Sequence, residues 1–410
     1  MMTMTGASKR GKRGRAPAMW SLSMVFLGLL ALLPAAGAQA GSVDPGMLLA
    51  GGVDQFNGPM ASAEFYDFKT LAWTCGFLGG VNAATGACAN TLAQARFFAS
   101  VAPLTSHEVL IAGGNNVGTT CLNSAAIYNP STGKFTATGS MTDAHCFAHT
   151  TTVLSNGYVL ITGGEDQTGN FVNTADMYDP STGKFDCSGL GGVSASTSYC
   201  QDTMTDVRFL HTATLLQNGN VLIAGGNDGS IVNTAEVYVW ASGFTATGNM
   251  TDSRENHTAT LLSNGNVLIA GGLDASGVVQ QSAELYSAGT FTATGSMTHP
   301  RYLHTATRLN SGKILITGGE DGTGTVLATA EVYSAGTFTA VGNMTTARAL
   351  HTAVLITSGP KKGYVLIAGG TDNNGNTLKS AELFNPNKGT FSATGSMQVG
   401  RSSQDGTALP

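Results

Sequence analysis

Five histidines recur at equivalent places along the chain, and histidine is the side chain most often used for metal binding or for proton transfer near neutral pH. They are His149, His211, His257, His304 and His351. A ring of metal ligands is one interpretation of this column. We favour a structural one, because a residue needed in successive copies of a repeat usually makes a hydrogen bond that the repeat itself requires.

An acidic side chain also recurs, two residues after a Gly-Gly pair. The aspartates are Asp54, Asp166, Asp228, Asp274, Asp321 and Asp372, and Asn116 stands at the equivalent position after the second Gly-Gly pair. Oxygen-rich loops suit calcium. One carboxylate per loop, however, falls short of the Asp-x-Asp-x-Asp-Gly array of a calcium-binding loop. We therefore predict Asx turns that hold these loops in shape.

These columns belong to one unit that occurs seven times. Its clearest mark is a Gly-Gly pair after a short branched run: Gly51-Gly52, Gly113-Gly114, Gly163-Gly164, Gly225-Gly226, Gly271-Gly272, Gly318-Gly319 and Gly369-Gly370. A Tyr or Phe follows, then a second aromatic, then an Arg and His-Thr-Ala. Each unit holds four strand-length segments separated by turns. Four strands per unit predict the blades of a β-propeller.

An acid and an arginine recur together. The acids are Glu64, Asp176, Glu236, Glu284, Glu331 and Glu382; the arginines are Arg96, Arg208, Arg254, Arg301, Arg348 and Arg401. The second unit has Ala126 in place of the acid, and His145 stands where the next Arg is expected. This joint loss predicts that each acid pairs with the Arg that follows it, and that a Cys121–Cys146 disulfide replaces the pair in the second unit.

The Gly-Gly pair, the following Tyr, the later aromatic and the Arg before His resemble kelch repeats over essentially the whole chain after residue 40. One departure is the outer aromatic, usually Trp in kelch units but Phe in six of the seven here. The resemblance implies an all-β, seven-bladed propeller over residues 41–410 with four antiparallel strands per blade. Residues 401–409 read as the first strand of an eighth unit, so we expect the C-terminal strand near Thr407 to complete the blade that begins at Met47.

The six cysteines sort by spacing. Cys75 and Cys88 have twelve residues between them, as do Cys187 and Cys200, and both segments contain Leu-Gly-Gly-Val. We predict two matched insertions, each closed by its own disulfide and each stabilised mainly within its own loop. Cys121 and Cys146 form the third predicted disulfide. A zinc site is disfavoured, because no Cys-x-x-Cys occurs.

A ligand site is expected where the units differ. The chain order puts the loop after each Gly-Gly and the loop between blades on one face. The residues that vary there and that we predict to bind a ligand are Phe97, Phe147, Phe209, Glu255, Asn256, His299 and Tyr302. They could stack on a sugar or hold a peptide. The alternative is that the aromatic side chains only pack between blades.

The first functional hypothesis is a scaffold or binding module for a glycan or a protein. The rival is a carbohydrate-active enzyme, because the sequence is similar to the kelch propeller of galactose oxidase-like enzymes. That resemblance implies a copper site with a Tyr–Cys cross-link, but no residues match the copper motif one by one. A sugar epimerase would need only polar residues at the mouth of the channel, so this hypothesis is kept as an alternative. We expect no catalytic residues and no cofactor, since neither copper nor calcium is supported.

The N-terminal forty residues predict export. Lys9, Arg10, Lys12, Arg13 and Arg15 precede an apolar run from Met19 to Leu33 and then Ala38-Gln39-Ala40. This order is typical of a cleaved signal peptide, with an uncleaved anchor as the alternative. Cleavage leaves 15 basic and 25 acidic residues, which disfavours nucleic acid and anionic membranes as partners. We expect a secreted or periplasmic protein, without membrane insertion and monomeric.

Overall fold

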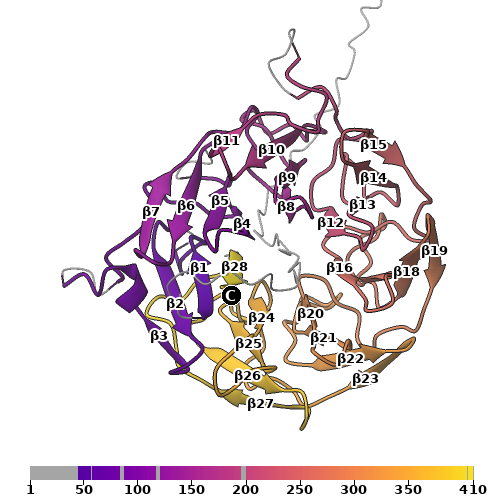
Figure 1. The fold of residues 1–410 in the computed structure, drawn as a ribbon. Helices are drawn as coiled ribbons and strands as arrows, with labels where there is room; N and C mark the ends of the chain where they lie inside the picture. Colours follow the sequence, from indigo (N-terminus) through magenta and orange to yellow (C-terminus); the bar gives the residue numbers. More distant parts are fainter. Residues whose placement is uncertain are drawn as a thin grey trace, which may run out of the picture.

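The computed structural model describes residues 45–409, apart from 57, 84–86, 117–120, 195–199 and 404. Seven four-stranded antiparallel sheets stand around a central axis as the blades of a propeller (Figure 1). The predicted fold class is confirmed. The signal peptide predicted for residues 1–40 lies outside the described residues.

The strands run outward from the axis in chain order. The inner strands of blades 1 to 7 are β28 (Asp405–Ala408), β4 (Ser100–Pro103), β8 (Thr150–Val153), β12 (Thr212–Leu215), β16 (Thr258–Leu261), β20 (Thr305–Arg308) and β24 (Thr352–Leu355). The second strands are β1 (Gly46–Ala50), β5 (Val109–Ala112), β9 (Val159–Thr162), β13 (Val221–Ala224), β17 (Val267–Ala270), β21 (Ile314–Thr317) and β25 (Val365–Ala368).

The third strands are β2 (Ala63–Asp67), β6 (Ala125–Asn129), β10 (Ala175–Asp179), β14 (Ala235–Val239), β18 (Ala283–Ser287), β22 (Ala330–Ser334) and β26 (Ala381–Asn385). The outer strands are β3 (Ala72–Thr74), β7 (Lys134–Ala137), β11 (Lys184–Phe185), β15 (Gly243–Ala246), β19 (Thr290–Ala293), β23 (Thr337–Ala340) and β27 (Thr390–Ala393). A 3-10 helix, η1 (Gly76–Leu78), follows β3. No helix in the described part of the chain is long and apolar enough to span a bilayer.

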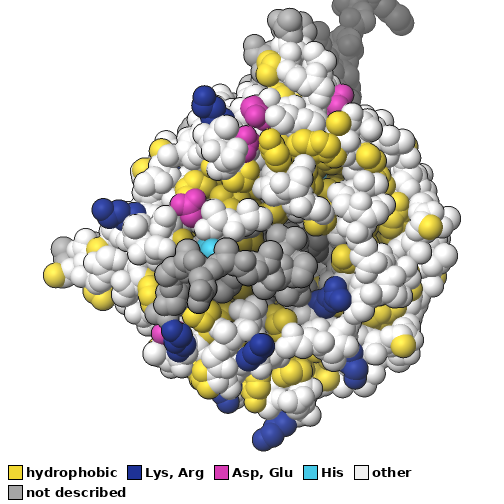
Figure 2. All heavy atoms as spheres, viewed as in Figure 1, with side chains coloured by type: hydrophobic (Ala, Val, Ile, Leu, Met, Phe, Trp, Pro, Cys, Tyr) yellow, Lys and Arg dark blue, Asp and Glu magenta, His cyan; other side chains and the backbone are white. Residues whose placement is uncertain are grey.

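Two faces result from this order. The loops after the Gly-Gly pairs and between blades form the loop face. The turns between the first and second strands and between the third and fourth strands form the turn face, which Figures 1 and 2 show.

The core lies between blades. The second strand of every blade is buried along its whole length, as its branched apolar run predicts. Because strand side chains alternate, Leu222 packs with Ile269 of blade 5 while Ile223 packs with Leu160 of blade 3. Each blade therefore contributes to two cores, and the ring buries apolar surface on both sides of every sheet.

The recurring Tyr fastens one blade to the one before it. In blade 5 the Tyr286 ring packs on Phe291, and its hydroxyl lies 3.1 Å from Thr247 Oγ1 of blade 4. Blades 1, 3 and 6 repeat this Thr–Tyr bond. In blades 2 and 4 the hydroxyl donates to a carbonyl of a disulfide-closed insertion instead, Phe77 O for Tyr128 and Gly189 O for Tyr238.

The Gly-Gly pair is required because the chain turns there against the next blade. Gly225 has φ +63°, and a Cβ on it would lie 2.4 Å from Arg254 O. That contact is far too short, so only glycine fits. In every blade except the third, where His145 takes its place, an arginine then holds the corner of its own blade: Arg301 donates from Nη1 to Gly318 O at 2.6 Å.

The acids pair with arginine, but with the Arg that precedes each blade rather than the one that follows it. The pairs are Arg208–Glu236, Arg254–Glu284, Arg301–Glu331, Arg348–Glu382 and Arg401–Glu64, at 2.9–3.1 Å. The predicted pairing was wrong in this respect. Ala126 therefore leaves Arg96 without a carboxylate among the residues that the structure describes, while His145 contacts Asp176 at 3.1 Å. The Cys121–Cys146 disulfide does not replace one lost pair, because two different pairs are affected.

The ring closes as predicted. β28 pairs with β1 in the register Met47↔Ala408 and Leu48↔Thr407, so blade 1 takes its inner strand from the end of the chain. Ser402 also pairs with Val53 outside the named strands.

Candidate functional site

The mouth of the propeller on the loop face is built from three neighbouring columns of residues. The first column directly follows the Arg in six units and follows Cys146 in the remaining one: Phe97, Phe147, Phe209, Glu255, Tyr302, Ala349 and Ser402. The second column comes next in the chain: Phe98, Ala148, Leu210, Asn256, Leu303, Leu350 and Ser403. The third column follows the Gly-Gly pair: Val53, Asn115, Glu165, Asn227, Leu273, Glu320 and Thr371. Isolated bridges join the first and third columns in six blades.

Every residue of the second column has a left-handed backbone, with φ between +52° and +61°. Such angles are uncommon for residues other than Gly and Asn, and only Asn256 is of that kind here. All seven blades repeat these angles, so the angles result from the turn that leads the chain into each inner strand. The backbone of the mouth is therefore fixed by the repeat, while its side chains vary.

One side of the mouth is aromatic. The Phe98 ring lies 4.5 Å from the Phe147 ring and 5.1 Å from that of Phe97. Phe209 stacks on Phe171 with centroids 4.1 Å apart and an interplanar angle of 18°. Phe97 and Phe209 are buried, at 8% and 6% exposure, so these two side chains do pack within the loops. Phe147 is half-buried and contacts both clusters.

The other side of the mouth is polar. Asn227 Nδ2 donates to Glu255 Oε2 at 2.8 Å. Burial raises the pKa of Glu255, and this bond offsets only part of the shift. The adjacent Asn256 is 6% exposed, and its Oδ1 has no hydrogen-bond partner within the described part of the chain. Such an orphaned buried acceptor is rare in proteins and calls for an explanation.

Tyr302 and Glu320 form a second polar pair. The Tyr302 hydroxyl donates to Glu320 Oε1 at 2.9 Å. Burial first, and then the adjacent Glu320, raise the pKa of Tyr302, so the phenol stays protonated and holds the carboxylate in place.

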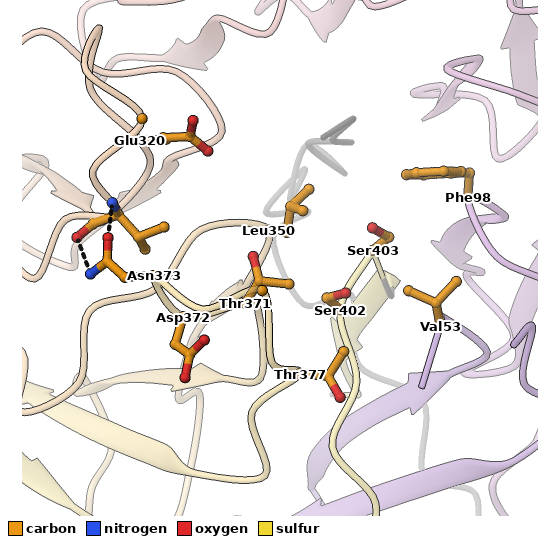
Figure 3. A pocket seen from close by; sticks show the side chains of 13 residues that line it. Val53, Phe98, Glu320, Leu350, Thr371, Asp372, Asn373, Thr377, Ser402 and Ser403 are labelled. Carbon is orange, nitrogen blue, oxygen red and sulfur yellow. Dashed lines mark hydrogen bonds between the residues drawn. The ribbon is translucent and has the colours of Figure 1, made fainter. Parts of the chain in front are cut away.

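A cavity of about 310 Å³ opens between the loops of blades 6, 7 and 1. Figure 3 shows Glu320 on one side and Phe98 on the other, with Leu350, Ser402 and Ser403 between them. Asn373 is not available to a ligand there, because its amide accepts from Val326 N at 2.7 Å and donates to Val326 O at 3.3 Å (Figure 3).

None of the seven residues predicted to bind a ligand lines this cavity. Tyr302 touches it only through Glu320, and Phe97 and Phe147 only through Phe98. His299 is exposed on the connection between blades 5 and 6 and bonds to Thr298 Oγ1 at 3.0 Å. The lining residues that sequence reasoning missed include Glu320 of the third column and Ser403 of the second. Those columns vary between units as much as the first, and that variation was the available signal.

The five recurring histidines are fully buried links between blades. His257 Nε2 lies 2.9 Å from Thr212 Oγ1, and His351 Nε2 lies 2.9 Å from Thr305 Oγ1 of the preceding blade. Burial lowers the pKa of both histidines to about 3, so they are neutral. Within the described residues no group of three or more His, Cys, Asp or Glu side chains is arranged to hold a metal.

The recurring aspartates make the predicted Asx turns. Asp274 Oδ1 accepts from Ser276 N at 2.8 Å and from Val278 N at 2.9 Å. Asp321 and Asp372 repeat the pattern with the residues two and four positions on.

The three predicted disulfides are present: Cys75–Cys88, Cys121–Cys146 and Cys187–Cys200. The two insertions do more than stabilise themselves. Leu78 and Leu190 are fully buried in the cores that blades 2 and 4 share with their neighbours. Three disulfides indicate an oxidising compartment.

Comparisons agree with this fold. A family model described as Kelch motif matches residues 146–187. No curated protein sequence matches the chain. The solved structure of YjhT is 11% identical with a TM-score of 0.55, covering 73% of this chain and 97% of its own.

A second solved structure is a fungal alcohol oxidase of the AA5 family in complex with copper. It is 18% identical with a TM-score of 0.56, covering 75% of this chain and 66% of its own. At these identities the similarity concerns the fold alone. The chain is thus a seven-bladed β-propeller whose third blade carries the matched Kelch motif.

Proposed function

We propose that the protein is a binding module that takes a glycan or a protein segment at the mouth of the loop face. The observation that carries this is the cavity between Phe98 and Glu320, which is lined by residues from columns that vary between blades. An aromatic edge, a carboxylate and serine hydroxyls together are the chemistry that orients a hydroxylated ligand in a pocket of this size. A glycan is therefore the first ligand class to test.

Two further features of the mouth support the proposal, one at the cavity and one outside it. Glu320 is held by the Tyr302 hydroxyl, so it is already oriented before a ligand arrives. Asn256 does not line the cavity, but elsewhere in the mouth its buried Oδ1 has no donor among the described residues. A ligand hydroxyl or amide would supply that donor and remove the cost of leaving the oxygen unpaired.

The test is glycan-array binding by the purified protein, followed by titration of any hit against variants. Glu320→Gln and Tyr302→Ala should each lower affinity at least tenfold, about 1.4 kcal/mol. Glu108→Gln makes the same chemical change on the turn face and should leave affinity unchanged. Phe209→Ala should also weaken binding, but its melting must be checked, because Phe209 stacks on Phe171. Unchanged affinity for a confirmed ligand in Glu320→Gln would refute this placement.

Export is the second part of the proposal. Cleavage after Ala40 would release the propeller into a periplasm or outside the cell, and the three disulfides fit that destination. N-terminal sequencing of the exported protein checks it. Expression without residues 1–40 should leave the protein in the cytoplasm.

An enzyme at the same mouth is the alternative, and Glu255 favours it. A half-buried carboxyl with a raised pKa is the kind of group that serves as a general acid or base, as a sugar epimerase requires. A copper-radical oxidase does not fit the residues present. All six cysteines are in disulfides, leaving none for a cross-link to Tyr, and the recurring histidines bond to hydroxyls of neighbouring strands. Turnover of a bound sugar that is abolished by Glu255→Gln would establish the enzyme. Stoichiometric copper binding with peroxide release would overturn both the binding module and the conclusion that the residues do not fit a copper-radical oxidase.

A further inference from the structure

A second cavity lies on the turn face, between blades 6 and 7. Its volume is about 640 Å³. The turn between β20 and β21, the turn between β24 and β25, and the turn between β26 and β27 enclose it. Of the described residues that line it, the charged ones are Lys313 and Lys362, both exposed, and none is an acid. This cavity is on the opposite face from the mouth and plays no part in the proposed function.

The cavity depends on a turn that is longer than its counterparts. Nine residues, 356–364, join β24 to β25, whereas five, 309–313, join β20 to β21. The extra residues bring Lys361 and Lys362 to the surface. The turn is anchored from outside: a Cβ on Gly359, which has φ +74°, would lie 2.2 Å from Phe68 O of blade 1. The two lysines therefore stand on a turn packed against the neighbouring blade.

Positive charge gathers around this cavity. Lys361 Nζ lies 4.9 Å above the Tyr364 ring, and Lys388 is exposed on the turn after β26. Lys313, Lys361, Lys362 and Lys388 are four of the eight lysines in residues 45–409, and the turns of blades 6 and 7 contain no acid. Figure 2 shows Lys and Arg side chains gathered over the part of the turn face where blades 6, 7 and 1 lie in Figure 1.

The equivalent cavity between blades 4 and 5 gives a comparison within the same molecule. It has a volume of about 370 Å³ and is enclosed by the turn after β12 and the turn after β18. Gln217 and Asn218 line it, and no lysine, arginine or acid does. A cavity between neighbouring blades is thus a feature of the propeller fold, and lysines make the cavity between blades 6 and 7 cationic.

We infer that the cavity between blades 6 and 7 binds an anionic oligosaccharide, with Lys313 and Lys362 contacting its carboxylate or sulfate groups. The chain has a formal net charge of -5, so its overall charge does not attract polyanions, and binding would depend on this local group of lysines. A saccharide fits better than a flat anionic surface, because the charges flank a hollow. Asn310, Asn387 and Ser334 line that hollow and offer hydrogen bonds to sugar hydroxyls.

The test is a binding titration of the whole protein at low and physiological salt. The probes are a sulfated heparin fragment, a polyuronate fragment and neutral dextran of similar length. We expect binding of at least one charged probe, weakening as salt rises, and none of dextran. The double variant Lys313→Gln/Lys362→Gln should bind the charged probe at least tenfold more weakly. Whichever anion binds identifies the group recognised.

The matched control is Lys134→Gln/Lys184→Gln. These lysines are also exposed, at the starts of β7 and β11, and the variant loses the same charge from the same face. It should bind within twofold of the wild type. Equal losses in the two double variants, equal binding of dextran, or no binding of either charged probe would overturn the inference. Glu320→Gln should not change this binding, so failure here and failure of the mouth as a glycan site are distinguishable.

Discussion

Arg401 Nη2 lies 2.9 Å from Glu64 Oε1, although 337 residues separate them in the sequence. The same guanidinium donates from Nη1 to Gly51 O at 3.0 Å and to Ser62 O at 3.1 Å. Both ionised groups are buried. In blades 4 to 7 this bond joins segments of one continuous repeat, whereas here it ties the end of the chain to its beginning and closes the ring.

Arg401→Ala should therefore destabilise the whole ring. Removing the arginine leaves the Glu64 carboxylate buried without a counterion, which costs about 3–5 kcal/mol of unfolding free energy. Deleting residues 401–410 removes the inner strand of blade 1 as well and should cost more. Denaturant unfolding followed by circular dichroism measures both. Glu64→Leu/Arg401→Met removes both charges and should recover much of the loss; a truncated protein that melts at the full-length temperature would contradict the role of the tail.

Much of the fold could be predicted because the same structural requirement recurs at the equivalent position of each blade and selects the same residue type. Gly225 shows this: its corner admits no Cβ, so Gly-Gly marks every blade. The pairing of acids with arginines could not be predicted from spacing. Arg301 follows Glu284 by fewer residues than Arg254 precedes it, yet the Gly-Gly corner folds Arg254 onto Glu284.

The candidate site was less predictable than the fold, for a related reason. The cavity at the mouth combines Phe98 of blade 2 with Glu320 of blade 6 and Ser403 before blade 1. No repeat dictates such a combination, since it depends on how several different loops meet around the axis. The first column was visible in the sequence, but of its residues only Ser402 lines the cavity, and the other lining residues come from the neighbouring columns and the loops that follow them.

Ala126→Glu should stabilise the protein by supplying the carboxylate that blade 2 lacks. Arg96 is 2% exposed and bonds only to Gly113 O and to Ser124 among the described residues, and burial lowers its pKa to about 10. A charge-assisted bond to a glutamate there is worth about 1.5–3 kcal/mol before the cost of burying the acid. Denaturant unfolding measures the gain. Ala137→Glu, the exposed neighbour on β7, adds the same charge and should give none; a loss of stability in Ala126→Glu beyond that control would show that the blade cannot accommodate the acid.

Stability should fall as the pH drops below about 6.5, because the recurring histidines stay neutral in the folded protein. Burial lowers the pKa of His351 to about 3, whereas the unfolded chain takes up the proton near its ordinary value. Each such histidine therefore costs up to about 1.4 kcal/mol per pH unit between those two values. The opposite shift at His145, whose pKa is raised because its contact with Asp176 outweighs burial, adds stability that is lost as the pH rises.

His351→Gln tests this dependence directly. The amide can still bond to Thr305, so the fold should persist, while the slope of unfolding free energy against pH falls by about one proton in the window from about 6.5 down to about 3. His299→Gln removes an exposed imidazole and is the matched control for the chemical change itself. If the slope of unfolding free energy against pH were the same in the wild type and in His351→Gln, His351 would not be a neutral, buried histidine in the folded protein.

The double variant Cys187→Ala/Cys200→Ala tests whether this disulfide stabilises only its own loop or the whole propeller. The insertion closed by this disulfide supplies Gly189 O to the Tyr238 hydroxyl at 2.8 Å and buries Leu190 between blades 3 and 4. Losing the cross-link should therefore lower the unfolding free energy of the whole protein by about 2–4 kcal/mol. Trp240 is beside the insertion and reports local loosening by fluorescence, while circular dichroism reports the ring. Coincident transitions at lower denaturant are expected for both signals; an early Trp240 transition with unchanged circular dichroism would show that the disulfide serves only its own loop.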